Sequence, residues 1–355
     1  TKSGYDKRYC VYLKLDDEPI AENGTPPSRE SLIDALRVLW KPWSLFKFAS
    51  VEDRAGMLAA ILTALSRPVL QKSPGLLFDA AMPSSGKTIA ARALNTLITG
   101  RHGAGVVAFQ NDRNFDVELN KVFVTLSVYG GSVFQLDNVD GFLQSPTLAA
   151  QLTSGHVSGR LLGGNTWHEG SLRPFITLTS NNCALHKDLS RRFVRVRIDP
   201  GVEIPQARLF PFLPENLARQ SRFDIAAAGI TLMRGFIAAG MPQTATDDAG
   251  YEEWTRLIRN AVLWIHDQGL DVAAGLGEVG DPAHALLAPA PSEDQRVAAE
   301  KILLRGLAMH FGNRAFQARE LADICGKPQD QLDETKQLIR AGLIEMLPGR
   351  QEITA

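Results

Sequence analysis

The chain has 355 residues, of which 45% are hydrophobic, and it carries a formal net charge of −1. This length allows two or three domains with a substantial core. The balanced charge excludes binding to nucleic acid or membrane that is driven by the total charge of the protein, so any basic surface must be local. The three cysteines lie far apart without a C-x-x-C pair, which excludes a disulfide framework and a zinc site and indicates a reducing compartment.

The apolar stretches of the chain are short. The longest, such as residues 225–233, reach about half the length that a membrane span needs, and the sequence has no signal-peptide pattern. We therefore expect a cytoplasmic protein with no membrane partner. The chain begins with Thr1 rather than Met, which indicates a fragment of a longer protein.

Residues 1–70 predict a strand followed by two helices. The strand is expected in "YCVYLKL", and the first helix is "SRESLIDALRVLW", which begins behind Ser28 or Ser31. The second helix, "SVEDRAGMLAAILTALSR", has Ser50 as its N-cap and acidic residues in its first turn, and it ends before Pro68. An N-terminal region with one strand and two helices follows from these signals.

Residues 71–200 consist of short apolar runs that alternate with helical segments. Each run has the length of a strand and is rich in β-branched or aromatic residues, and the runs are 75–80, 105–109, 132–137, 174–180 and 193–198. Strands separated by helices are typical of a parallel sheet that helices cover. The expected fold class is therefore α/β, with this sheet as the core.

The remainder of the chain predicts helices. Residues 201–275 form a helical region, and one amphipathic segment in it carries an apolar stripe of Trp254, Leu257, Ile258, Ala261, Val262 and Ile265. Residues 276–292, rich in Ala, Gly and Pro, indicate a linker. Residues 293–355 predict three helices and a short two-stranded wing, as in a winged-helix-like module, although another small helical tail fits the same pattern. The last of these helices, 328–342, has three acids among few bases, so docking or regulation fits it as well as DNA binding does.

One segment of the core, "FDAAMPSSGKT" at residues 78–88, has the residues of a phosphate-binding loop. Gly86 allows a close approach of the backbone, Lys87 reaches the β- and γ-phosphate oxygens, and Thr88 is a ligand of Mg²⁺. The segment lies between an expected strand and an expected helix, where such a loop belongs. We therefore predict a site for ATP and Mg²⁺, with a purely structural turn as the alternative.

This loop departs from the pattern G-x-x-x-x-G-K-[ST] at two places. Ala81 replaces the first glycine, whose main role is a tight turn that alanine can make at a negative φ. Ser84 stands where many ATPases of this kind have another glycine, yet it keeps its backbone N–H. We therefore still expect the backbone N–H groups of Ser84, Ser85 and Gly86 to face the phosphates.

Polar residues follow two further strands of the expected sheet. Asp137 ends a buried strand beside the loop, where a carboxylate that binds Mg²⁺ is expected. The next position often holds a glutamate that orients the attacking water; here it is Asn138, and Asp140 is either a substitute base or a helix cap, with Glu118 as a weaker candidate. Asn181 ends another strand and can place its amide against the γ-phosphate, or it can simply form a turn.

Two arginines, Arg191 and Arg192, precede the last strand of the sheet. Paired arginines cannot both be buried without partners. One interpretation is a solvated strand entrance. The other is an arginine offered to the nucleotide of a neighbouring subunit, where it would stabilise charge in the transition state, and this function requires a ring.

Taken in order, "FDAAMPSSGKT", "VFQLDNVDGFL", "SGHVSGRLLGGNT" with "TLTSNN", and "DLSRRFVRVRIDP" resemble the AAA+ helicase module of phage and mobile-element primase-helicases, which are close to the superfamily-three and MCM helicases. The resemblance extends over about residues 45–345. It implies a P-loop AAA+ core in a homo-oligomeric ring, a hexamer, that hydrolyses ATP, and it implies a primase domain or another replication protein as a partner. The residues carried over are Lys87 and Thr88 of Walker A, Asp137 of Walker B, Asn181 of sensor one, and Arg192 as the arginine finger with Arg191 as its rival.

The resemblance also concerns DNA. The segment "GRLLGGNTWHEGSLRPF" predicts a strand, a tight tip and a strand, and in the family a hairpin at this place points into the ring channel and grips DNA. The tip would carry Asn165, Thr166, Trp167 and His168, where an aromatic ring can stack on a base, and Arg160 or Arg173 would meet phosphate. The alternative is that Trp167 packs under the hairpin as a small satellite core.

The sequence thus favours an ATP-dependent helicase or translocase that acts as a ring on single-stranded or forked DNA in the replication of a phage or mobile element. Two alternatives stay open. One is an AAA+ ATPase that remodels or loads a protein partner, and the other is a nucleotide-switched binding module with little turnover. The balanced charge fits both alternatives slightly better.

Overall fold

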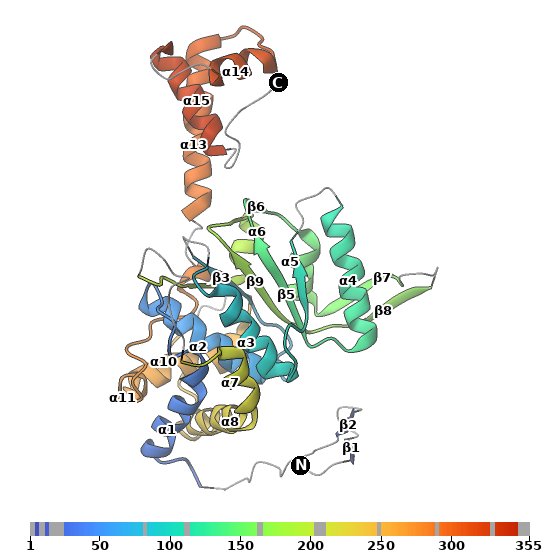
Figure 1. Cartoon of the computed structure of the whole chain (residues 1–355), viewed down its shortest axis with the longest axis vertical. Helices are drawn as coiled ribbons and strands as arrows, with labels where there is room; N and C mark the ends of the chain where they lie inside the picture. The colour runs from blue at the N-terminus through green and yellow to red at the C-terminus, as the bar shows by residue number, and fades with distance from the viewer. Residues whose placement is uncertain are drawn as a thin grey trace.

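The structure is a computed structural model, and it describes residues 4–6, 11–13, 25–80, 84–109, 114–161, 166–201, 211–246, 250–287, 291–326 and 331–346. Its centre is one sheet of five parallel strands (Figure 1), ordered β11-β3-β9-β5-β4. The strands are β3 (Gly75–Asp79), β4 (Val106–Ala108), β5 (Val133–Val139), β9 (Phe175–Ser180) and β11 (Phe193–Arg197). The five strands expected from the sequence are confirmed, and so is the α/β fold class.

Both faces of this sheet are covered by helices. Side chains of a strand alternate between the two faces, and in β3 this places Leu76 and Phe78 in one core and Leu77 in the other. The first core contains side chains of α1 (Arg29–Trp40), α2 (Val51–Ser66), α3 (Lys87–Thr99) and α8 (Arg222–Ala238), and the second those of α4 (Phe115–Tyr129) and α5 (Pro146–Ser154). Strands covered on both faces carry mostly apolar side chains, and polar exceptions such as Gln135, Thr179 and Arg195 have polar partners.

The first two long helices begin where the sequence predicts. Ser28 caps α1 and accepts a hydrogen bond from the Ser31 N–H at 3.2 Å, and Ser50 caps α2 and accepts from the Asp53 N–H at 3.1 Å. Each cap satisfies one of the N–H groups that a helix start leaves without a partner. At the N-terminus, β1 (Gly4–Asp6) and β2 (Val11–Leu13) form an antiparallel pair, and β2 lies inside the expected strand.

The elements around the sheet are short. They include the one-turn 3₁₀ helix η1 (Lys41–Trp43), the parallel pair β6 (Phe142–Leu143) and β10 (Ala184–Leu185), the hairpin of β7 (His156–Arg160) and β8 (Trp167–Ser171), and the helices α6 (Lys187–Ser190) and α7 (Pro214–Gln220). The hairpin expected between the third and the fourth sheet strand in sequence is therefore present. Within the described residues, none of the helices is long and apolar enough to cross a bilayer.

The amphipathic segment after α8 contains a wider turn. It consists of α9 (Glu252–Trp254), the π-helical turn η3 (Thr255–Arg259) and α10 (Asn260–Asp267). The Asn260 amide donates to the Thr255 carbonyl at 3.0 Å across this turn. The predicted stripe faces the first core, since Trp254, Ile258, Ala261, Val262 and Ile265 are buried and Leu257 is half-buried.

The stretch that the sequence indicates as a linker contributes to the first core. After α11 (Leu270–Ala273) the chain buries Leu276, Val279, Ala283 and Leu286, the last of these in α12 (His284–Leu287). Asp281 pairs with the buried Arg259, with Nη2–Oδ2 at 2.5 Å, and this pair fastens the stretch to η3. Residues up to 286 therefore pack with the first core. Apolar side chains spaced along a stretch can pack in this way even where the backbone forms little regular structure. The division of the whole chain into domains stays a prediction.

The C-terminal helices form a small core of their own. They are α13 (Pro291–Phe311), α14 (Ala318–Cys325) and α15 (Glu334–Met346), coloured orange to red in Figure 1. Their core contains Phe311, Ile324, Leu332 and Ile339. The three expected helices are present, while the expected wing, residues 344–355, begins inside α15, and its residues 347–355 lie outside the described residues.

A buried hydrogen bond between α2 and α9 supports a first prediction. Trp254 Nε1 donates to Thr63 Oγ1 at 2.9 Å in the first core. Thr63→Val keeps the shape of the side chain but leaves the indole N–H buried without its acceptor, and we expect it to lower the free energy of unfolding by about 1–3 kcal/mol. Thr63→Ser, which keeps the hydroxyl, is the control, and denaturant unfolding measures both. A Thr63→Val variant as stable as the wild type would show that this hydrogen bond contributes little to stability.

Candidate nucleotide-binding site

The loop between β3 and α3 has the backbone of a phosphate-binding loop. Gly86 caps α3 with a left-handed φ of 99°, and a Cβ at this position would lie 2.8 Å from Cε1 of Phe46. Both facts require glycine here. Ser84 also has a left-handed φ, 59°, which fits the glycine usual at this position. Ala81, the other departure, lies outside the described residues.

Lys87 is the first residue of α3, and its side chain turns toward the end of β9. Its Nζ donates to Asn181 Oδ1 at 2.8 Å and to Ser85 Oγ at 3.1 Å. Burial lowers the pKa of Lys87, against the opposing attraction of Asp79 and Asp137. The predicted phosphate lysine and the predicted sensor asparagine are therefore in direct contact, at the positive end of a helix.

Asp137 lies near the carboxyl end of β5, and its carboxylate is held by three donors. Its Oδ1 accepts from Thr179 Oγ1 at 2.7 Å, from Thr88 Oγ1 at 3.1 Å and from Gln135 Nε2 at 3.2 Å. All three bonds end on Oδ1, so Oδ2 is the oxygen that they leave open. A hydroxyl and a carboxylate in contact are hard oxygen ligands of the kind Mg²⁺ takes together with phosphate and water.

This donor set fits Mg²⁺ bound jointly with a nucleotide. In the described part of the chain, no group of three or more His, Cys, Asp or Glu side chains could hold a metal by itself. Thr88 and Asp137 supply two oxygens, and Mg²⁺ ordinarily takes one or two protein carboxylates and completes its shell with phosphates and water. The residues present thus suit a metal that arrives with the phosphates.

Asn138 occupies an irregular place in β5. Its φ is 59°, the pairing of β5 with β9 shifts register between Leu136 and Val139, and its N–H donates to Thr179 Oγ1 at 2.9 Å. Asparagine tolerates the left-handed region better than glutamate does. The absence of the usual glutamate therefore coincides with a backbone bulge that disfavours it.

The two candidate bases are placed differently. Asp140 is exposed and, among the described residues, makes no hydrogen bond or ion pair with the site. Glu118 is exposed on α4, where Lys121 donates to it at 2.6 Å. The structure thus brings together Ser85, Gly86, Lys87, Thr88, Asp137 and Asn181, and it does not join Asp140 to them.

The arginine pair stands at the entrance of β11. Asp188 in α6 holds both side chains, since Oδ1 accepts from Nη2 of Arg191 and from Nη2 of Arg192, each at 3.0 Å. Arg192 Nε also donates to the Asp188 carbonyl at 2.7 Å, and these hydrogen bonds lower the pKa of Asp188. The Arg191 side chain is 62% exposed and that of Arg192 is 21% exposed, so Arg191 is freer to reach outward.

The hairpin extends from the sheet beside α4 (Figure 1), with Arg160 directly opposite Trp167. Trp167 is 63% exposed, which excludes the satellite core as its environment. His168 instead turns to α4, with Nε2 3.1 Å from Ser127 Oγ. Arg173 follows β8 and contacts the region of Gly155 at the base of the hairpin. Arg160 and Trp167 thus lie together at the far end, whereas His168 and Arg173 do not.

Sequence reasoning missed the residues that support these side chains. Gln135 and Thr179 hold Asp137, and Asp79 lies next to the loop at the end of β3. The signal was available: a glutamine inside an apolar strand, and an aspartate ending a strand as Asp137 does. Buried polar side chains in such strands need partners, and those partners are found in the site.

Comparison with known proteins gives distant similarities. No protein-family model and no curated protein matches the chain. Among solved structures, a JCV helicase bound to a thiazolopyridine compound has 17% identity and a TM-score of 0.30, covering 73% of this chain and 74% of that one. A second JCV helicase structure has 16% identity and a TM-score of 0.28 over the same shares. The active helicase Cch of SCCmec type IV has 12% identity and a TM-score of 0.35, covering 85% of this chain and 59% of that one. All three TM-scores lie below 0.5, so these similarities carry no conclusion about function.

The bulge at Asn138 leads to a second prediction. Asn138→Glu restores the usual glutamate but places it at a left-handed φ, and we expect the free energy of unfolding to fall by about 1 kcal/mol. Asn138→Gly should cost nothing at this φ, and it serves as the control in the same denaturant titration. A glutamate variant as stable as the wild type would mean that the bulge relaxes easily.

Proposed function

We propose that this chain is an ATP-driven motor of the helicase or translocase type, which binds ATP with Mg²⁺ and uses its hydrolysis to move on single-stranded or forked DNA. The observation that carries the proposal is the convergence of Lys87, Thr88, Asp137 and Asn181 at one edge of a parallel sheet, beside the N-terminus of α3. In parallel sheets, ligands bind at this edge.

The loop would hold the triphosphate by its backbone. The N–H groups of Ser84, Ser85 and Gly86 lie at the start of α3, where the helix dipole favours an anion. Lys87 Nζ, now bonded to neutral oxygens of Asn181 and Ser85, would move its hydrogen bonds to the β- and γ-phosphates. A buried ammonium with a lowered pKa gains most from such an anion.

Thr88 and Asp137 would hold the Mg²⁺, which neutralises charge that develops on the phosphates. Thr179 and Gln135 keep the carboxylate of Asp137 turned toward Thr88. Asn181 would orient the attacking water beside the γ-phosphate. Asp140 stays the proposed base, because Glu118 is engaged by Lys121.

Completion of the site would come from a neighbouring subunit. We place Arg192 as the arginine that reaches the neighbour's nucleotide, with Arg191 as its rival, in a hexameric ring. Asp188 holds both guanidinium groups ready in one protomer. A guanidinium fixed by one carboxylate keeps other N–H donors for phosphate.

The hairpin is the proposed DNA contact. Trp167 can stack on a base and Arg160 can meet phosphate, and both lie at its far end. We keep His168 and Arg173 as weaker DNA contacts, because they lie nearer the body of the protein. The proposed setting is replication of a phage or mobile element, with a primase or other replication protein as partner and the C-terminal helices as a docking or winged-helix-like module.

A second candidate function is a nucleotide-switched binding module with little turnover. The observation that favours it is Asn138, which stands in place of the usual glutamate at a strained backbone position. This candidate requires ATP binding without DNA-stimulated hydrolysis, so one assay separates the two.

The test of the proposal is ATP hydrolysis with and without single-stranded DNA, together with displacement of a labelled strand from a fork. We expect the wild type to be active in both assays and Lys87→Ala to lose at least about 100-fold in turnover, since the lysine contributes to charge stabilisation. Lys72→Ala, an exposed lysine outside the site, is the control. A wild type that binds ATP but neither hydrolyses it nor displaces a strand would reject the motor.

The hairpin gives a separate prediction. Trp167→Ala should cost about 1–3 kcal/mol of affinity for single-stranded DNA through lost stacking, and Arg160→Ala should reduce the salt dependence of binding. Basal ATP turnover should stay unchanged in both. Phe223→Ala, another exposed aromatic residue that lies on α8, is the matched control in the same fluorescence titration. Stimulation of turnover by DNA that persists in Trp167→Ala would move the DNA contact elsewhere.

A further inference from the structure

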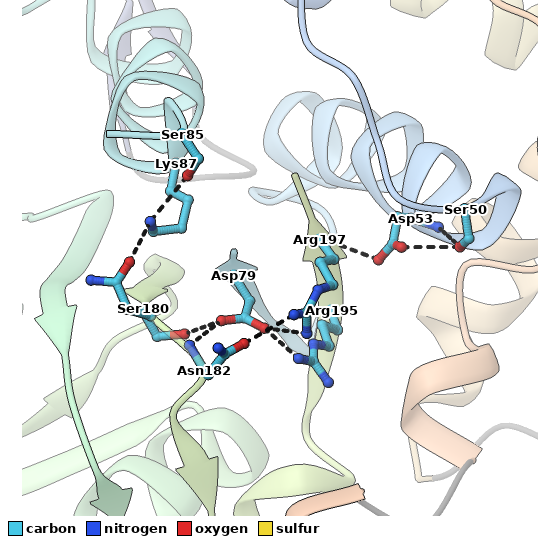
Figure 2. Close-up of polar contacts among 10 residues, drawn as sticks. Ser50, Asp53, Asp79, Ser85, Lys87, Ser180, Asn182, Arg195 and Arg197 are labelled. Carbon is cyan, nitrogen blue, oxygen red and sulfur yellow. Dashed lines mark hydrogen bonds and ion pairs between the residues drawn. The ribbon is translucent and has the colours of Figure 1, made fainter. Parts of the chain in front are cut away.

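A second polar cluster lies directly behind the nucleotide site. Figure 2 shows Asp79 between Ser180 and Asn182 on one side and Arg195 and Arg197 on the other. Asp79 ends β3, immediately before the phosphate-binding loop, and its side chain is 1% exposed. We call these five residues the Asp79 cluster.

The carboxylate of Asp79 is fully engaged. Its Oδ1 accepts from the Asn182 N–H at 2.8 Å and from Ser180 Oγ at 2.9 Å, and its Oδ2 pairs with Arg195 and, at 3.3 Å, with Arg197 Nη1. Burial alone would raise the pKa of Asp79, but the charge of Arg195 and these hydrogen bonds outweigh burial and lower it. The group is therefore a carboxylate at neutral pH, and a buried carboxylate needs all these partners.

Asp79 accepts hydrogen bonds from the residues on both sides of Asn181. Ser180 is the residue before Asn181 and Asn182 the residue after it, and Asp79 Oδ1 bonds to both. Asn182 has a left-handed φ of 53°, so the chain turns sharply at this place. The side chain of Asn181 is thereby directed to Lys87 Nζ, 2.8 Å away.

The arginines fix the cluster to the rest of the protein. Arg197 Nη2 donates to Asn182 Oδ1 at 3.0 Å, and the Arg197 N–H donates to Asp53 Oδ1 at 2.7 Å. Asp53 lies in the first turn of α2 and is bonded to the N-cap Ser50. The position of Asn181 thus depends on β3, β11 and α2 together, through the carboxylates of Asp79 and Asp53.

From these contacts we infer that Asp79 is a positioning residue for hydrolysis: it holds Asn181 in the place where its amide meets Lys87 and would orient the attacking water. The inference rests on the proposed ATPase function. Asp79 lies behind the loop, and both oxygens of its carboxylate are bonded to donors of the protein. We therefore expect that replacing Asp79 changes the affinity for the phosphates only slightly. Its effect on turnover is transmitted by Asn181.

The first measurement separates binding from chemistry. We expect Asp79→Ala to lower kcat roughly 10- to 100-fold, as removal of a supporting residue commonly does, while the Kd for a fluorescent ATP analogue with Mg²⁺ changes by less than about 3-fold. Asp271→Ala is the matched control, because Asp271 is equally buried and accepts hydrogen bonds from His266 and Val279 away from the site. Both variants should lose stability, but the control should keep its kcat.

The decisive measurement is a double-mutant cycle with Asn181. If Asp79 acts through Asn181, then Asp79→Ala lowers kcat no further, within about 2-fold, in a chain that already carries Asn181→Ala. If Asp79 only supports the fold, the kcat losses of the two single variants multiply in the double variant. Ser180→Ala, which removes one hydrogen bond on the Asn181 side and spares both ion pairs, should give a smaller loss of kcat that also vanishes in the Asn181→Ala background.

The outcomes distinguish this inference from the proposed function. A wild type that turns over ATP, together with unchanged kcat in Asp79→Ala or multiplying losses in the cycle, would overturn the role of Asp79 and leave the ATPase intact. A wild type without turnover would overturn the proposed function and this inference with it. If Asp79→Ala does not fold, the Ser180→Ala and Asn181→Ala cycle decides alone: multiplying losses there also overturn the inference.

Discussion

The hydrogen bond between Lys87 and Asn181 joins the two elements on which the site depends, the N-terminus of α3 and the carboxyl end of β9. Burial of the Lys87 ammonium is unfavourable for its positive charge and lowers its pKa, although the carboxylates of Asp79 and Asp137 attract it. The protein sustains this cost at a place where backbone N–H groups also point outward from a helix start. A bound anion would offset the burial of the ammonium and would accept hydrogen bonds from these N–H groups. A phosphate is an anion that can do both.

The parallel sheet makes this meeting possible. Strands that run in one direction end at one edge, so residues that follow separate strands far apart in sequence become neighbours. The strand order places β9 between β3 and β5. Asn181 therefore lies between the loop that follows β3 and the Asp137 carboxylate near the end of β5. Thr179, on the same strand, donates to Asp137 and accepts from the N–H of Asn138. The strand β9 therefore supports both the carboxylate on β5 and the asparagine that contacts Lys87.

Much of this was predictable because it depends on local sequence. Strand-length apolar runs, serine caps and a glycine before Lys87 each act within a few residues, and the parallel rule then brings the strand ends together. The strand order, the left-handed Asn138 and the arginine partners of Asp79 were not predictable, since they depend on neighbours across strands. A related reason applies to the stretch after Ala273. Its composition is typical of a linker and predicts one, whereas Leu276 and Val279 are buried in a core that local sequence does not reveal.

Asp79 and Asp137 show how far such neighbours decide a role. Both are aspartates at or near the carboxyl ends of buried parallel strands. Asp79 lies opposite Arg197 on β11 and opposite Ser180 on β9, and these partners consume both of its oxygens. Asp137 receives its three hydrogen bonds on one oxygen and has the Thr88 hydroxyl beside it. The Asp79 carboxylate is thus neutralised by arginines of the protein and suits a role in holding other residues in place. The Asp137 carboxylate has a second oxygen, Oδ2, that its three hydrogen bonds leave open for the proposed cation. The difference arises from β11, whose arginines lie beside the first strand and not beside the third.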